Sequence, residues 1–457
     1  MGSVDCPECL GNFLAALFPF LKTLLARPAV RAAADNFGWM LAERIARLVF
    51  NVGVGFWVAR YLGPDRFGEL NYALALVGVA ALVAELGLEG LVRRELIRVP
   101  ARATEILVTT AGLRLAGGAL AWALVILMAC FGWGGVEGRT LLPVLGLTLF
   151  QPALFVSDLY FQAHLKAKIS VGAQMIALIA GAAGRIALIM LAAPLVGFAW
   201  AAVAEMLVAG LVLALLARRQ GLALRPALFD AGRAVGLLRE AWPLLMSGFA
   251  VTLYLRLDAI MLRSMVGVQE VGIYAAAVRF TEIWYFVPVA LAASLLPALM
   301  RARERGPSAY ARRLQAGYDL NAGLAYILAV PLTLLAPWVI QTAYGPAYAP
   351  AARVLSLHIW SSVFVFLGVA RGQFLLNEGR TGFYLWATVA GLFVNATLNL
   401  ALIPHHGAWG AALATLVGQA VAAWLTSFCF APVRSSALMQ TKALLIPFRW
   451  YRYVQPA

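Results

Sequence analysis

Seven arginines lie inside stretches of the sequence that are otherwise apolar. These residues are Arg44, Arg47, Arg114, Arg185, Arg256, Arg279 and Arg371. A guanidinium group binds phosphate oxygens through charge-assisted hydrogen bonds that are often bidentate, and it also pairs with carboxylates. An arginine at the centre of a membrane-spanning helix costs about 2.5–3.5 kcal/mol, so these side chains must face protein or water.

Carboxylates in the same stretches offer an alternative role for these arginines, as partners in structural ion pairs. The embedded acids are Glu43, Glu85, Asp158, Glu205, Asp258 and Glu282. Since they nearly equal the embedded arginines in number, the sequence leaves both roles open. The net charge of any cavity depends on which of these groups face inward.

Spacing separates the arginines into stronger and weaker candidates for binding an anion. Arg44, Arg47 and Asn51 recur at i, i+3 and i+7, which places them on one face of a helix. Arg279 and Glu282 are three residues apart and can neutralise each other. Arg256 and Asp258 are two apart, so they point to roughly opposite sides and need separate partners.

The remaining three arginines carry weaker signals. Arg185 lies in "AGAAGRIALIM", where small residues favour close helix packing. Arg114 and Arg371 have no patterned polar neighbour. We therefore rank Arg114 and Arg371 below the first group, and helix packing is the alternative role for Arg185.

The elements that must position these residues are membrane-spanning helices. Of the 457 residues, 63% are hydrophobic and only 12% are charged. This hydrophobic fraction exceeds what the core of a soluble protein requires. A crossing needs about 20 apolar residues, and the chain offers about twelve such stretches. They cover residues 37–59, 70–90, 105–131, 140–162, 172–193, 195–217, 240–262, 271–299, 316–339, 354–376, 382–403 and 407–431.

Basic residues are distributed unevenly between the two sides of these spans. With both termini cytoplasmic, the segments on the inner side hold 24 of the 36 Lys and Arg residues, and the outer loops hold 5. This is the positive-inside pattern, and it accounts for the net charge of +15 without a nucleic-acid partner. The basic runs "RARERG" (301–306) and "LARRQG" (216–221) are suited to anionic lipid headgroups.

Two glycine-containing outer loops indicate an internal repeat. Gly63 and Gly68 are five residues apart, as are Gly267 and Gly272, and the two pairs are offset by 204 residues, close to six helices. Six-helix halves in the same orientation predict two bundles related by a pseudo-two-fold axis along the membrane normal. We expect the four glycines to act as hinges between moving bundles.

The resulting domain scheme has five parts. It comprises an N-terminal cytoplasmic or interfacial segment (1–36), a six-helix bundle (37–217), a cytoplasmic linker (218–239), a second six-helix bundle (240–432) and a basic cytoplasmic tail (433–457).

Three segments resemble a known family of transporters. They are "FWVARYLGPDRFGELNYALALVGVAALVAELGL" (56–88), "LDAIMLRSMVGVQEVGIYAAAVRFTEIWYFVP" (257–288) and "YGPAYAPAARVLSLHIW" (344–360). They are similar to the polysaccharide-biosynthesis transporters, the O-antigen (Wzx-like) flippase branch of the multidrug/oligosaccharidyl-lipid/polysaccharide (MOP) superfamily. The resemblance covers residues 36–429. The chain departs from the peptidoglycan-precursor branch of the superfamily, which typically has fourteen spans where this sequence has about twelve. That branch therefore fits the sequence less well.

The resemblance implies an all-α, multidrug-transporter-like fold and a flippase rather than an enzyme. Its substrate would be an undecaprenyl-pyrophosphate-linked oligosaccharide, moved to the outer leaflet of the bacterial inner membrane, with membrane lipids and polysaccharide polymerase machinery as partners. By position, Arg44, Arg47 and Arg256 match the family's headgroup-binding arginines, with Arg279 as a helper and Glu282 as its partner or as a proton-coupled group.

Other chemistries are less well supported by the sequence. "CPEC" (6–9) lacks a second cysteine pair for a zinc site, and we expect neither a metal nor a cofactor. A membrane-embedded sugar polymerase would need a large outer loop. A cation-coupled multidrug antiporter of the same superfamily stays open, and it would depend on Asp258, Glu282 and Glu85.

Overall fold

The computed structural model describes residues 28–222 and 225–449, and every regular element in these ranges is helical. The first half of the chain forms α2 (Pro28–Glu85), α3 (Glu89–Arg98), α4 (Ala103–Cys130), α5 (Gly135–Gly146), α6 (Gln151–Leu154), α7 (Val156–Ala163), α8 (Ala167–Met190) and α9 (Leu195–Arg219). We call these helices the N-terminal bundle.

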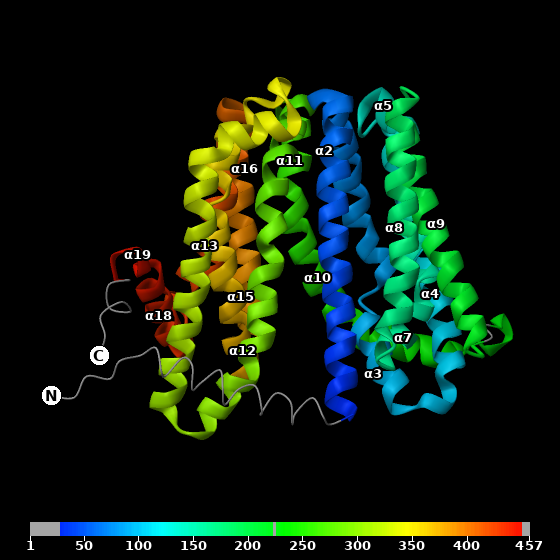
Figure 1. Cartoon of the computed structure of the whole chain (residues 1–457), viewed down its shortest axis with the longest axis horizontal. Helices are drawn as coiled ribbons and strands as arrows, with labels where there is room; N and C mark the ends of the chain where they lie inside the picture. The colour runs from blue at the N-terminus through cyan, green and yellow to red at the C-terminus, as the bar shows by residue number, and fades with distance from the viewer. Residues whose placement is uncertain (1–27, 223–224, 450–457) are drawn as a thin grey trace.

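The second half forms the C-terminal bundle, which stands beside the first (Figure 1). Its helices are α10 (Ala231–Met265), α11 (Val268–Glu282), α12 (Phe286–Glu304), α13 (Pro307–Tyr344), α14 (Ala351–His358), α15 (Ser361–Asn377), α16 (Thr381–Ala420), α17 (Thr426–Cys429), α18 (Arg434–Leu444) and α19 (Ile446–Arg449).

Ten helical stretches in the described residues are long and apolar enough to cross a membrane. Two of them, Ala46–Arg98 and Gly382–Cys429, contain 53 and 48 residues, more than twice what one crossing needs. Each is kinked at a glycine with positive φ, Gly63 (φ 69°) in α2 and Gly407 (φ 55°) in α16. Divided at these kinks, the ten stretches become about twelve crossings, so the expected all-α fold is confirmed.

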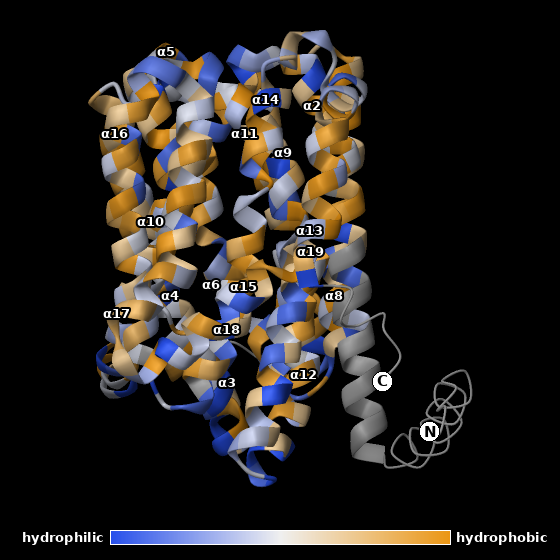
Figure 2. Ribbon diagram, turned by 90° about the vertical axis from the view of Figure 1, so that its left-hand side faces the viewer, coloured by the Kyte–Doolittle hydropathy of each residue, from blue (hydrophilic) through white to orange (hydrophobic). Residues whose placement is uncertain are grey.

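The two ends of the molecule differ in their chemistry. One, here the glycine end, carries the turns at Gly63, Gly267, Gly345 and Gly407. The other, the basic end, carries α3, the α9–α10 linker and the turn between α12 and α13. Figure 2 shows hydrophilic ribbon gathered toward both ends and predominantly hydrophobic ribbon between them, as a membrane-spanning protein requires.

Two boundaries differ from the sequence-based scheme. α10 begins at Ala231, well inside the segment expected to be linker. The segment expected to be a basic tail contains α18, whose Ser436 and Gln440 are fully buried. The Tyr318 hydroxyl of α13 lies 2.5 Å from Ser436 Oγ, so α18 packs into the C-terminal bundle. Residues 1–27, most of the predicted N-terminal segment, lie outside the described residues.

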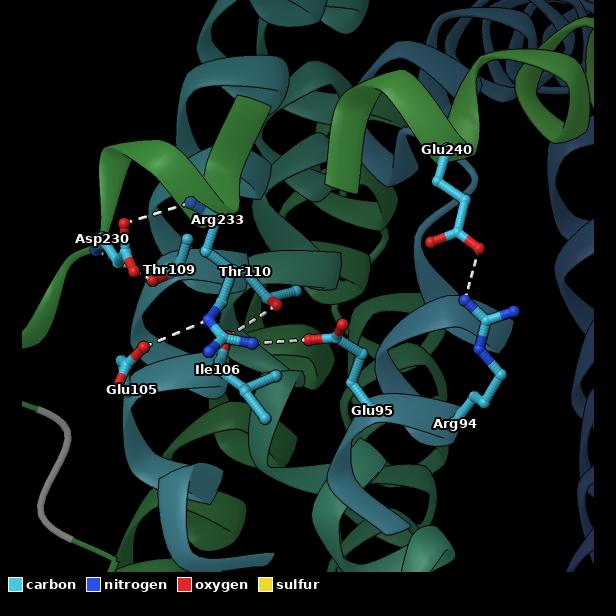
Figure 3. Close-up of polar contacts among 9 residues, drawn as sticks. All are labelled: Arg94, Glu95, Glu105, Ile106, Thr109, Thr110, Asp230, Arg233 and Glu240. Atoms are coloured by element: carbon cyan, nitrogen blue, oxygen red, sulfur yellow. Dashed lines mark hydrogen bonds and ion pairs between the residues drawn. The ribbon is translucent and has the colours of Figure 1, made fainter. Parts of the chain in front are cut away.

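Ion pairs join the first turn of α10 to the N-terminal bundle at the basic end (Figure 3). Asp230 caps α10 by accepting the Arg233 backbone N–H at 3.1 Å. The Arg233 guanidinium donates to Glu95 of α3 at 2.7 Å and to Glu105 of α4 at 3.1 Å. α10 therefore starts on one bundle and runs into the other.

Candidate functional site

The N-terminal bundle holds a polar cavity of about 290 Å³ that is lined by Arg47 and Arg185. Arg47 Nε donates to Glu43 Oε1 at 2.7 Å, and its Nη2 donates to Gln174 Oε1 of α8 at 2.9 Å. Arg185 pairs with Glu205 of α9 at 2.8 Å. Both guanidinium groups thus have carboxylate partners. This is the structural ion pairing that the sequence offered as the alternative role for embedded arginines.

Two members of the predicted polar face on α2 cannot be placed by their side chains. Arg44 and Asn51 lie on α2, but their side chains are outside the described part of the structure. Their role stays a prediction.

Arg279 reaches from the C-terminal bundle into a second cavity, of about 240 Å³, which also borders Arg185. Its guanidinium carbon lies 6.0 Å from the centre of the Phe67 ring of α2. A Cβ atom at Gly55 would lie 2.5 Å from Arg279 Nη1, so this glycine lets the guanidinium pass close to α2. Among the described residues no carboxylate pairs with Arg279.

Arg256 and Glu282 are exposed side chains that lie within electrostatic reach of each other. Arg256 Nε would lie 3.5 Å from a Cβ atom built at Gly78 of α2, so this side chain also meets the opposite bundle. Glu282 interacts electrostatically with Arg256 and Arg279, but it forms no ion pair within 4 Å with a described residue. The arrangement leaves these charges accessible rather than mutually sealed.

Asp258 is 4% exposed and is surrounded by neutral donors in the C-terminal bundle. Its Oδ1 accepts from Asn395 at 3.1 Å and from Asn399 at 2.6 Å, both on α16. Its Oδ2 accepts from the hydroxyls of Tyr274 and Thr415, each at 2.5 Å. No described cationic side chain pairs with Asp258, so the carboxylate is solvated by protein without being neutralised by it.

Glu85 lies apart from Asp258 and Glu282. It is exposed at the end of α2, and its electrostatic neighbours are Arg114 and Glu89 at the basic end. The structure does not bring it together with the other two candidate coupling acids.

The four predicted hinge glycines divide into two functions. Gly63 and Gly267 have φ of 69° and 111° and form the turns. Gly68 and Gly272 lie within helices, where a methyl group at Gly68 would overlap the Val268 carbonyl oxygen and one at Gly272 would overlap that of Pro64. Since Pro64 and Val268 are themselves offset by 204 residues, the contact is reciprocal, as a pseudo-two-fold axis requires.

Aromatic rings extend this contact between the bundles at the glycine end. Phe56 lies 5.1 Å from Phe280 and 5.0 Å from Tyr344, measured between ring centroids. The Tyr348 hydroxyl donates to the Ala59 carbonyl oxygen at 2.9 Å. Burial raises the pKa of the Tyr348 phenol, which therefore stays protonated as a donor. Together with the glycine contacts, these residues close the glycine end.

Arg114 and Arg371 are buried against neutral acceptors, mainly backbone carbonyls. Arg114 donates to the Pro152 carbonyl oxygen at 3.0 Å, where α6 interrupts the span. Arg371 donates to the Ala422 carbonyl oxygen at 2.7 Å, within a π-helical turn at Val421–Leu425. Irregular helix turns free such carbonyls, so these two arginines have structural partners.

Comparison with known proteins identifies the family. The model of the family described as "Polysaccharide biosynthesis protein" matches residues 33–303, more than half of the chain. The chain belongs to the polysaccharide biosynthesis protein family. The matched region runs from α2 into α12, so it covers the N-terminal bundle together with Asp258, Arg279 and Glu282.

Two relatives are similar to part of the chain. Probable flippase AglR of Haloferax volcanii is 31% identical over 180 residues, which are 36% of each chain. Uncharacterized membrane protein YabM of Bacillus subtilis is 28% identical over 208 residues, 41% of this chain and 37% of the relative. The chain thus matches a little over a third of the length of these relatives.

Solved structures confirm the fold of this family member. An inward-facing multidrug resistance MATE transporter of the MOP superfamily matches with a TM-score of 0.66 at 18% identity, over 88% of this chain and 99% of that one. The lipid II flippase MurJ matches with a TM-score of 0.68 at 15% identity, over 92% and 93%. The expected MOP-type architecture is therefore confirmed.

Proposed function

We propose that this membrane protein is a flippase that moves an undecaprenyl-pyrophosphate-linked oligosaccharide from the cytoplasmic to the outer leaflet for surface polysaccharide assembly, such as O-antigen. The observation that carries the proposal is Arg279, whose guanidinium pairs with no carboxylate in the described part of the chain and reaches from one bundle into a cavity of the other. A pyrophosphate linkage supplies the oxygens that such a group binds. Membership of a polysaccharide biosynthesis family supports a glycan cargo.

The charge distribution supports one orientation for this transport. The basic end would face the cytoplasm of a bacterial inner membrane, with both termini on that side. Because the glycine end is closed by reciprocal backbone contacts, substrate would enter from the basic end. There the exposed Arg256 would meet the pyrophosphate, and Arg279 would receive it deeper between the bundles. Arg47, and Arg44 beside it on α2, would extend this path.

Transport by rocking bundles also needs a source of energy, such as an ion gradient. We assign Asp258 as the group that couples transport to this gradient. A buried carboxylate held by four neutral donors can take up a proton or a small cation without breaking an ion pair. Glu282 is the second candidate for coupling. The same feature favours the cation-coupled antiporter as the second candidate function.

A leaflet-resolved assay of lipid-linked oligosaccharide tests the proposal. Cells lacking the protein should accumulate the lipid-linked intermediate on the cytoplasmic side, and the wild type should relieve this. Arg279→Ala and Arg256→Ala should fail to relieve it, with Arg279→Lys intermediate because lysine keeps the charge without the bidentate fork. Arg139→Ala, at an exposed arginine of α5 near the glycine end, is the matched control.

Two results would count against the flippase. One is normal leaflet distribution in the deletion strain. The other is a loss of resistance to cationic drugs that depends on Asp258 but not on Arg279, which would favour the antiporter.

A further inference from the structure

A groove at the basic end of the C-terminal bundle gathers four arginines that the proposed transport path does not use. Arg301 lies in the last turn of α12, Arg305 follows directly after the helix, and Arg312 and Arg313 lie near the start of α13. They line a groove of about 490 Å³ whose other walls are Ala298, Ala302, Ala309 and Ala316. Four guanidinium groups around one groove repel each other unless an anion lies between them.

These four arginines form no ion pair with the described residues. All four side chains are exposed, and no described carboxylate pairs with any of them. By contrast, Arg303 on the same helix pairs with Glu378 at 3.6 Å. The positive-inside bias calls for basic residues at this end, but it does not call for four of them to converge.

An apolar trench continues from the arginines into the bundle. It has a volume of about 190 Å³, and it shares Arg313 and Ala316 with the basic groove. Leucines of α12 and α13 line it, namely Leu295, Leu296, Leu299, Leu314 and Leu320. A Cβ atom at Gly317 would meet nothing within 4 Å, so the trench is open beside that residue. Arginines therefore adjoin a narrow, mainly apolar surface.

We propose that this groove captures the lipid-linked substrate before it moves between the bundles, which rests on the proposed function. The arginines would hold the pyrophosphate, and the trench would hold the first isoprenoid units. A pyrophosphate diester carries two charges on a single chain, which suits several arginines beside one narrow trench. A glycerophospholipid such as phosphatidylglycerol carries one phosphate charge and two acyl chains, which fits the groove less well.

Binding to the full-length protein in phosphatidylcholine nanodiscs tests the proposal directly. The probe is undecaprenyl pyrophosphate, and its occupancy is counted by native mass spectrometry over a titration. Arg312→Gln/Arg313→Gln should weaken binding about tenfold or more, from the loss of two charge-assisted contacts. The matched control is Arg218→Gln/Arg219→Gln, an adjacent exposed pair at the end of α9.

A second variant tests the trench separately from the charges. Gly317→Leu should weaken binding of undecaprenyl pyrophosphate but leave binding of inorganic pyrophosphate unchanged, because it fills only the apolar part. Gly172→Leu, which also enters open space on a helix, is the control. The proposal is overturned if the control arginine pair weakens binding equally, or if phosphatidylglycerol displaces the probe at equal concentration.

This measurement separates the groove from the transport function. Selective, groove-dependent binding together with a normal leaflet distribution in deletion cells would overturn the flippase and leave the groove standing. A clear flippase defect in deletion cells, together with probe binding that the groove substitutions do not change, would overturn the proposal for the groove and leave the flippase standing.

Discussion

The cavity between α2, α8 and α9 and the interface between α10 and α16 stabilise charges within membrane-spanning helices in opposite ways. In the first region Arg185 and Glu205 neutralise each other at 2.8 Å. In the second, Asp258 accepts hydrogen bonds from neutral amides and hydroxyls, and no described cationic side chain pairs with it. An ion pair is a closed arrangement, whereas a carboxylate among neutral donors can still exchange a proton or a cation.

The energetic logic of the two regions differs as well. Removing one partner of a buried pair leaves an uncompensated charge, while removing both can be neutral or stabilising. Replacing Asp258 by the amide of the same shape removes the charge and turns one acceptor oxygen into an NH2 donor, which the Tyr274 and Thr415 hydroxyls can accept. These differences allow each region to be tested on its own.

The largest effect is expected for Asp258→Asn. Transport should fall about a hundredfold or more, equivalent to about 2.7 kcal/mol in the transport barrier, because the amide can neither take up a proton nor bind a cation as the carboxylate does. Folding should be little affected because the amide fills the same space and its NH2 group can donate to the Tyr274 and Thr415 hydroxyls. Leaflet-resolved transport at several pH values and sodium concentrations measures this. Asp258→Asn transport that keeps wild-type rate and ion dependence would show that Asp258 is a structural residue.

The next effect concerns the stability of the first region. Arg185→Leu should lower the free energy of unfolding by about 2 kcal/mol, since Glu205 is left unpaired where it is only 20% exposed. Arg185→Leu/Glu205→Leu should recover most of this loss. Unfolding in detergent, followed by circular dichroism, gives both values. A double variant that is as unstable as the single one would mean that the pair itself stabilises the bundle.

The sequence predicted the crossings and the repeat but not the partners of the embedded arginines. The crossings follow from apolar length, and the repeat follows from glycines at matching positions, both of which are visible along the chain. Arg371 illustrates what is hidden, because its acceptors include a carbonyl freed by a π-helical turn. Backbone irregularity of this kind has no clear signature in residue types.

A smaller effect is expected where the two halves contact each other as equivalents. Gly68→Ala and Gly272→Ala should each lower the free energy of unfolding by about 1–3 kcal/mol, because each methyl group overlaps a backbone carbonyl oxygen of the other half. Gly53→Ala, which meets open space on α2, is the control and should be neutral or stabilising. Clearly unequal losses for the two glycines would contradict a reciprocal contact.

The smallest effect is expected for the ion pair that joins the bundles at the glycine end. Arg263 and Glu69 lie 3.1 Å apart, with side chains 27% and 13% exposed. A double-mutant cycle with Arg263→Gln and Glu69→Gln should give a coupling free energy of about 0.2–1 kcal/mol that decreases with added salt. Coupling of several kcal/mol that salt does not change would mean that this pair is shielded from water.

Residues at the candidate site were predictable to different degrees for physical reasons. Arg279 could be singled out because an embedded charge is costly, but its insertion beside Gly55 depends on how two distant helices meet. Asn395 and Asn399 were not singled out, although their spacing of four residues in an apolar span is a detectable amide face. The relation of Asp258 to this face comes from tertiary packing between α10 and α16.

The ion pairs of Arg233 with Glu95 and Glu105 affect where genes of this family can be recombined. The natural joint in the sequence lies between α9 and α10, but the first turns of α10 are fastened to α3 and α4. A chimera joined at that point would match α10 of one parent to the carboxylates of another. With a crossover farther along α10, between Arg233 and Asp258, the Arg233 ion pairs would come entirely from one parent. Asp258 and its hydrogen-bond partners would come entirely from the other.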